Sequence, residues 1–160
     1  MSVTALILVS ALSGQTPYSS EIITYKKQEY EISFKEIPIA DLQNNRLKLQ
    51  SSAAEDLTDM IVAAAQDGVF IKVNYGFRDH DLQKQIFKRN RRYAAKPGNS
   101  KHEIGLAVDI NGIKKDKNLR RWLKQNAARF GWKQTIKRER WHFEYQKQDT
   151  QHCNQTQPNV

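Results

Sequence analysis

The sequence predicts a small α+β domain. Stretches with the alternating pattern of strands and stretches with the spaced apolar pattern of helices follow one another without a regular β–α–β rhythm. The length of 160 residues suits one domain and leaves little room for a second. We expect about three helices in a domain at residues 21–148, between an N-terminal segment at 1–20 and a polar tail at 149–160.

The first strand is expected within residues 25–38, where polar and apolar side chains alternate. This alternation places Tyr30, Ile32 and Phe34 on one face. Residues 41–50 are largely polar. They therefore predict a loop between this strand and the first helix.

The first helix is expected to begin at Ser52, because Ser52 and Glu55 have the spacing of a capping box. Apolar residues then recur at helical spacing, and Gly68 can end the helix. The apolar run at 69–75 predicts a buried strand, after which Asp79 can cap a second helix.

The second helix is expected to end in the basic run at residues 88–92. A loop containing Pro97 and Gly98 follows. The remaining elements expected are a short strand at 106–110, a helix at 118–130, and a hairpin with strands at 132–136 and 141–145.

The charge balance is basic. Lys and Arg number 26 against 17 Asp and Glu, which gives a formal net charge of +9 and a pI near 9.7. This charge favours anionic partners such as nucleic acid, acidic lipid or envelope polymers, without choosing among them. Cys153 is the only cysteine, so no intrachain disulfide can form, and any metal site must use histidines and carboxylates.

The N-terminus contains an apolar run at residues 3–12, followed by small and polar residues. Its length suits the central part of a signal peptide and is too short for a membrane span. No Lys or Arg precedes it, so a buried strand or an N-terminal helix stays open as an alternative. We expect no other segment to cross a bilayer.

His102 and His142 stand in unusual surroundings. Asp109 follows His102 closely and lies in an apolar strand, where an ionised carboxylate is costly without a cation or hydrogen bonds. Gly105 lets the backbone bend so that His102 and Asp109 reach one point, and strand alternation turns His142 away from its aromatic neighbours. Two imidazoles and one carboxylate suit a catalytic zinc ion, which keeps a coordination position for water.

Glu139 is the candidate general base beside that water. Because it stands three residues before His142, a regular strand would place the two on opposite faces. The hypothesis therefore requires a turn or bulge at residues 139–141. Two structural alternatives stay open: Glu139 pairs only with Arg138 or Arg140, or Asp109 caps a nearby turn.

Three motifs resemble the VanY-type D-alanyl-D-alanine carboxypeptidases. The run SKHEIGLAVD at 100–109 resembles the signature SxHxxGxAxD, and ERWHFEY at 139–145 is similar to an ExWHxEY-like second signature. Tyr75 to Arg78, followed by Gln83, resembles a third segment of that family. The resemblance covers roughly residues 50–147 and implies a compact α+β unit around a small antiparallel sheet, the D-Ala-D-Ala carboxypeptidase or hedgehog-like fold.

The resemblance also implies roles for individual residues. One zinc ion would be bound by His102, Asp109 and His142, and Glu139 would act as catalytic base and proton donor. Arg78 would stabilise the developing oxyanion. Gln83 and Ser100 would help to hold the substrate peptide.

The function expected is that of a zinc peptidase which removes a terminal D-alanine from peptidoglycan stem peptides, as a D,D- or L,D-carboxypeptidase. The alternative is an endopeptidase that cuts between L-alanine and D-glutamate, as related phage lysins do. A remote alternative is a basic nucleic-acid-binding module, but no base-reading motif is interleaved with the run at 88–92.

The basic surface is instead expected to contact anionic envelope polymers, with Lys88 and Arg89 as the residues to test. We expect a monomer. The protein would be periplasmic or exported if residues 1–15 act as a signal peptide, and otherwise cytoplasmic until release, as for a lysin.

Overall fold

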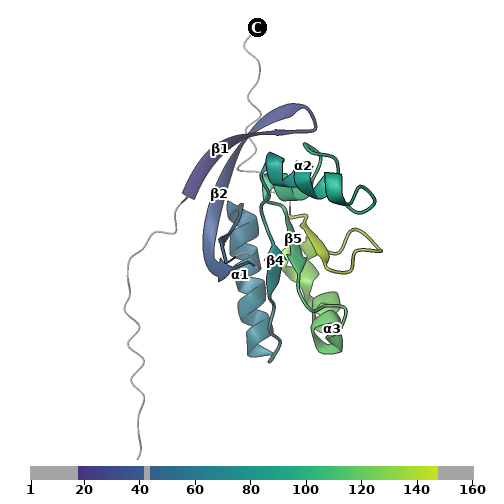
Figure 1. Cartoon of the computed structure of the whole chain (residues 1–160). Helices are drawn as coiled ribbons and strands as arrows, with labels where there is room; N and C mark the ends of the chain where they lie inside the picture. Colours follow the sequence, from purple (N-terminus) through teal and green to yellow (C-terminus); the bar gives the residue numbers. More distant parts are fainter. Residues whose placement is uncertain (1–17, 42–43, 148–160) are drawn as a thin grey trace, which may run out of the picture.

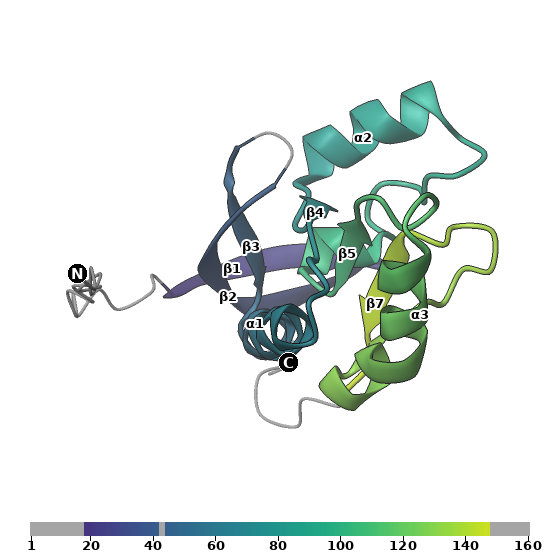
Figure 2. The same ribbon diagram turned by 90° about the horizontal axis from the view of Figure 1, so that it is seen from below.

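The computed structural model describes residues 18–41 and 44–147. Two antiparallel sheets and three α-helices form the domain, as predicted for an α+β chain (Figure 1). One sheet has the strand order β1-β2-β3 and the other β4-β5-β7-β6. In Figure 2, α1 and α3 lie on one side of the β4–β5 strands and α2 lies on the other. The elements are β1 (Tyr18–Tyr25), β2 (Gln28–Ala40), β3 (Arg46–Gln50), α1 (Ser51–Gln66), β4 (Val73–Tyr75), α2 (His80–Arg89), the 3-10 helix η1 (Lys101–Ile104), β5 (Ala107–Ile110), α3 (Lys117–Asn126), the 3-10 helix η2 (Ala127–Phe130), β6 (Trp132–Lys133) and β7 (His142–Tyr145).

The three-stranded sheet begins with a hairpin that the sequence did not predict. β1 and β2 pair around Lys26 and Lys27, whose φ angles of 52° and 67° suit a tight hairpin turn. The expected strand at 25–38 therefore corresponds to β2, with its start shifted by this turn.

The prediction of a loop at residues 41–50 is wrong for the second half of this segment, which forms β3 and pairs with β2. Leu47 and Leu49 alternate with polar residues and are 1% and 0% exposed. The polar residues between them led to the loop prediction, although two leucines at a spacing of two are enough to bury one face of a short strand.

The first helix begins one residue before its predicted start. Gln50 occupies the N-cap position and no side chain caps the helix, so the capping box expected for Ser52 and Glu55 does not form. Glu55 instead pairs with Lys35 at 2.9 Å. The predicted apolar stripe is confirmed, because α1 buries Leu57 and Met60 against the sheets.

The elements around the later motifs largely agree with their predictions. Asp79 caps α2 through a 2.7 Å hydrogen bond from the Leu82 N–H to its side chain. The strand expected at 69–75 is shorter, since only Val73–Tyr75 pairs with β5. The helix expected at 118–130 divides into α3 and η2, and the predicted C-terminal hairpin is present as β6 and β7.

The main core lies where α1, α3 and the four-stranded sheet meet. Val108 and Ile110 of β5 and Phe143 of β7 point into this core. Asp109 and His142 alternate with them and face the other side.

No helix among the described residues is long and apolar enough to span a membrane. The candidate signal sequence at 1–15 and the tail with Cys153 lie outside the described residues.

Candidate metal centre

Three elements bring His102, Asp109 and His142 together. Asp109 on β5 and His142 on β7 are register partners in the sheet. His102 lies in η1, which Ser100 and Glu103 close with a capping box. Gly105 ends η1 with a φ of 68°, in the left-handed region that favours glycine, and redirects the chain into β5.

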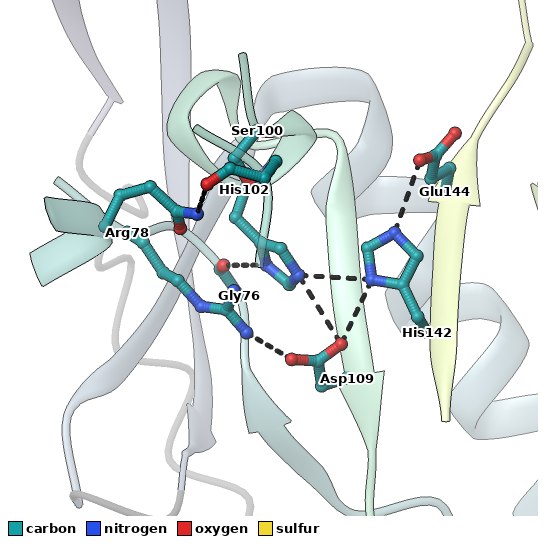
Figure 3. A network of polar contacts seen from close by, with 9 residues as sticks. Gly76, Arg78, Ser100, His102, Asp109, His142 and Glu144 are labelled. Atoms are coloured by element: carbon teal, nitrogen blue, oxygen red, sulfur yellow. Dashed lines mark hydrogen bonds and ion pairs between the residues drawn. The ribbon is translucent and has the colours of Figure 1, made fainter. Parts of the chain in front are cut away.

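The ligand atoms of these residues form a tight triangle (Figure 3). His102 Nε2 lies 3.3 Å from His142 Nδ1 and 3.4 Å from Asp109 Oδ1, and His142 Nδ1 lies 3.1 Å from the same oxygen. Metal–ligand bonds of about 2.0–2.1 Å at tetrahedral angles would separate neighbouring ligand atoms by about 3.3 Å. The spacing therefore fits a tetrahedral cation with three protein ligands.

Both imidazoles are held in the orientation that a ligand needs. His102 Nδ1 lies 2.7 Å from the Gly76 carbonyl oxygen, which accepts a hydrogen bond from the N–H at this position and leaves Nε2 to face the centre. His142 Nε2 lies 3.3 Å from Glu144 Oε1, which leaves Nδ1 to face it. Such contacts fix the tautomer and raise the basicity of the coordinating nitrogen.

Arg78 completes the surroundings of Asp109. Its guanidinium donates to Asp109 Oδ2, and Oδ1 remains directed at the two imidazoles (Figure 3). The Arg78 backbone N–H donates to the His102 carbonyl at 3.2 Å. The backbone and the side chain of Arg78 therefore both join the segment before α2 to the centre. Asp109 thus contacts Arg78 and two histidines, and the alternative in which it only caps a local turn is wrong.

The electrostatics suit cation binding. Burial acts to raise the pKa of Asp109, but the two imidazoles and Arg78 outweigh it and hold this pKa well below its usual range. Burial and Arg78 lower the pKa of His102, so its ring is neutral. Burial acts in the same direction on His142, but hydrogen bonds to Asp109 and Glu144 raise its pKa to about 9. A cation that binds this centre must displace the His142 proton.

Glu139 reaches the same cleft through the turn that the sequence required. The Glu139 carbonyl accepts from the His142 N–H at 3.0 Å, which closes a turn over residues 139–142. The Glu139 side chain is buried, and this burial raises its pKa. Among the described residues it forms no ion pair with Arg138 or Arg140, so the alternative of a solvated charged turn is not supported.

All seven side chains expected at the site line one cleft of about 440 Å³. Gln83 is 1% exposed and donates to the Ala95 carbonyl at 2.8 Å, while its Oε1 has no hydrogen-bond partner among the described residues. The Ser100 hydroxyl accepts from the His102 N–H at 3.3 Å. Ser100 therefore has a structural part in placing a ligand as well as a position on the cleft wall.

Four further residues belong to the site, and we did not select them from the sequence. The Glu103 carboxylate accepts hydrogen bonds from the N–H groups of Gly98 and Ser100 and so stabilises the loop that leads to His102. Glu144 orients His142. Tyr25 and Lys26 reach the cleft from the tip of the β1–β2 hairpin. The spacing of Ser100 and Glu103 was a readable signal for the first of these, whereas the hairpin contacts leave no local sequence pattern.

Within this α+β fold, His102, Asp109 and His142 form a buried group of candidate metal ligands, and Glu139 lines the same cleft. This arrangement is typical of metal-dependent hydrolases. The family model VanY, D-alanyl-D-alanine carboxypeptidase, matches residues 46–148. The chain therefore belongs to the VanY family.

Known proteins agree with this assignment. A D-alanyl-D-alanine carboxypeptidase of Enterococcus faecalis is 33% identical over 120 residues, which are 56% of this chain and 45% of the relative. The chain thus spans about half the length of that relative. A solved mutant of the vancomycin resistance D,D-pentapeptidase VanY, in complex with Zn(II), has a TM-score of 0.59 and 26% identity over 72% of this chain and 79% of its own. VanYB in complex with D-alanine-D-alanine is equally similar, at a TM-score of 0.59 and 26% identity over 72% and 78% of the two chains.

Proposed function

We propose that the protein is a zinc-dependent carboxypeptidase that removes the terminal D-alanine from peptidoglycan stem peptides. The observation that carries this proposal is the convergence of His102, Asp109 and His142 on one point, with Glu139 in the same cleft. Family membership supports the substrate class. The relatives named for D-alanyl-D-alanine or D,D activity favour the D,D bond over the L,D bond.

Zinc fits the ligand set. Two neutral imidazole nitrogens and one carboxylate oxygen are the ligand types of catalytic zinc sites, and their spacing matches a tetrahedral ion. When bound, zinc supplies Lewis-acid chemistry that polarises a carbonyl group and makes water acidic near neutral pH. His102, Asp109 and His142 would hold the ion.

Glu139 moves the proton during hydrolysis. Its carboxylate accepts a proton from the attacking water as the water oxygen bonds to the carbonyl carbon of the scissile amide. The same carboxyl group then donates this proton to the amide nitrogen as the carbon–nitrogen bond breaks. The raised pKa of Glu139 suits both steps, because the proton must be held and then released. The products are free D-alanine and a peptide with a new carboxyl group.

Arg78 stabilises the negative charge that develops on the carbonyl oxygen. Its guanidinium is fixed by Asp109, and its Nε atom is buried without a hydrogen-bond partner among the described residues. A preorganised charge of this kind is often worth several kcal/mol in the transition state. Gln83 lines the cleft, and its buried Oε1 has no hydrogen-bond partner among the described residues, so we assign Gln83 to an N–H group of the substrate.

Product identification tests the proposal. The zinc-loaded protein is incubated with a synthetic stem pentapeptide ending in D-alanyl-D-alanine, and products are identified by mass spectrometry. We expect free D-alanine and a tetrapeptide. A product with a new amino group on D-glutamate would replace the proposal by the endopeptidase alternative. Glu139→Ala should retain zinc and lose turnover by about 10²–10⁴, whereas His142→Ala should lose both. Full turnover by Glu139→Ala would contradict the mechanism.

A further inference from the structure

A second groove, of about 860 Å³, lies outside the catalytic cleft and is lined by α3, η2, β6 and the chain leading to β7. Seven of its lining residues are Lys or Arg, and none is Asp or Glu. This groove, which we call the basic groove, holds a large share of the cations of a chain with a net charge of +9. Its composition is therefore the strongest charge asymmetry among the described cavities.

The cations form two walls. Lys117, Arg120, Arg121 and Lys124 recur at helical spacing on one face of α3. Lys133, Lys137 and Arg140 form the facing wall, from β6 and the segment before β7. A linear anion between these walls would meet positive charge on both sides.

Within the part of the chain that the structure describes, no acidic side chain neutralises these cations. None of the seven forms an ion pair with a carboxylate of the described residues. The carboxylate next in sequence, Asp116, is engaged as the N-cap of α3 by the N–H groups of Asn118 and Leu119. Like charges gathered without partners repel one another, and a bound polyanion relieves that repulsion.

The shape and floor of the groove decide between classes of polyanion. Trp132 and Phe143 line it, but they are 0% and 5% exposed and so present no ring face for stacking a base. Proteins that hold single-stranded nucleic acid combine positive charge with exposed aromatic rings. A groove with charged walls also fits a linear chain better than a flat bilayer surface. These features favour a linear phosphate polymer without bases.

The basic groove and the catalytic cleft lie on opposite faces of β7 and of the segment before it. Lys137 and Arg140 line the groove, while Glu139 between them lines the catalytic cleft. On β7, His142 faces the metal centre and Phe143 faces the groove. A polymer held in the groove would therefore keep the enzyme on the material that carries the polymer without covering the catalytic cleft.

We propose that the basic groove binds an anionic, phosphodiester-linked polymer attached to the cell wall and so docks the enzyme on its substrate. This inference rests on the proposed function, because it takes the wall to be the substrate. Lys88 and Arg89 at the end of α2, where this contact is expected from the sequence, do not line the basic groove, so the two places can be tested against each other.

Wall binding by a charge-reversal pair tests the docking proposal. Arg121→Glu with Lys124→Glu changes the exposed face of α3, and Lys88→Glu with Arg89→Glu makes the same charge change at the exposed end of α2. Co-sedimentation of the zinc-loaded proteins is measured with purified walls that carry their phosphate polymer, and with walls stripped by hydrofluoric acid. We expect the α3 pair to lose about tenfold or more in affinity for intact walls at physiological salt, with a shallower salt dependence. The α2 pair should stay within about twofold of the parent.

Other outcomes would overturn the docking proposal. Equal losses for both pairs would show an effect of net charge alone, and undiminished binding to stripped walls would exclude the polymer. Tighter binding of a short single-stranded DNA than of intact walls would make the groove a nucleic-acid site. Hydrolysis of the soluble pentapeptide separates this test from that of the proposed function: both pairs should keep the parent rate. A parent that binds intact walls but releases no D-alanine would leave the docking site standing and remove the proposed function.

Discussion

Asp109 and His142 face each other across β5 and β7, and the backbone register that pairs them leaves their Oδ1 and Nδ1 atoms 3.1 Å apart. Two of the three candidate ligands are therefore placed by a sheet, which is a rigid support. The third, His102, is fixed by the Gly76 carbonyl and the Arg78 N–H. Because these supports are backbone groups, the centre is preorganised before a cation binds.

Removing the Glu144 carboxylate should weaken zinc binding without unfolding the protein. Glu144 holds His142 through Nε2 and is only partly buried, so Glu144→Ala frees the ring and lowers the basicity of Nδ1. We expect a loss of about 10- to 100-fold in zinc affinity, measured by competition with a chromophoric chelator. Glu144→Gln retains an acceptor oxygen and should recover most of the affinity. Unchanged affinity in Glu144→Ala would show that this contact does not tune the ligand.

The metal-free protein should lose stability as the pH rises from about 6.5 through 9. The folded pKa of His142, about 9, lies above its unfolded value of 6.5, so protonation of this ring stabilises the folded state. That contribution is complete below the unfolded pKa and is lost as the pH rises through the folded pKa. It is on the order of 3 kcal/mol at most.

Urea unfolding of the metal-free protein at several pH values measures this effect. In the zinc-loaded protein the ion takes the place of the His142 proton, so this fall in stability should disappear there. Zinc affinity should in turn rise with pH up to about 9, because one proton fewer must be displaced. A metal-free protein that is equally stable across this range would mean that His142 is not protonated in the folded state.

Gly105→Ala should disturb both the fold and the metal centre. An added Cβ would lie 2.5 Å from the Gln50 nitrogen and 2.8 Å from a ring carbon of Phe34, and the residue has a φ of 68°. Gly112→Ala is the matched control, since Gly112 has a φ of 75° but nothing within 4 Å of an added Cβ.

The positive φ alone should cost each variant roughly 1–2 kcal/mol. Gly105→Ala should lose clearly more, with weaker zinc binding because η1 must shift. Free energies of unfolding and zinc affinity of the two variants provide the measurement. Equal losses in the two variants would mean that the close packing of Gly105 on β3 contributes nothing.

Local sequence patterns predict much of the fold, and the places where these predictions are wrong have physical causes. Asp79 caps its helix as predicted, through the hydrogen bond that its side chain accepts from the Leu82 N–H. The capping box predicted for Ser52 and Glu55 does not form, because the chain enters α1 directly from β3 and Glu55 pairs with Lys35. A capping box did form at Ser100 and Glu103, where the acidic side chain is buried within a tight loop. The sequence pattern is the same in both places, and the tertiary surroundings decide which pair uses it.

The three candidate metal ligands could be named from the sequence because two family-like motifs contain them, and the structure brings the three side chains together. Strand alternation placed Asp109 and His142 on the face away from the core. Glu139 could be assigned only by requiring a turn, which its carbonyl forms with the His142 N–H. Because the β1–β2 hairpin was not predicted, the position of Tyr25 in the cleft wall was not predicted either. Contacts between distant segments of this kind depend on packing and leave no periodic signal.

Anomalous diffraction at the zinc absorption edge, on crystals of the zinc-loaded protein, locates the bound ion. We expect one strong peak at about 2.0–2.1 Å from His102 Nε2, His142 Nδ1 and an oxygen of Asp109, and no such peak in His142→Ala. A zinc ion bound elsewhere, or an undiminished peak at this centre in His142→Ala, would contradict this expectation.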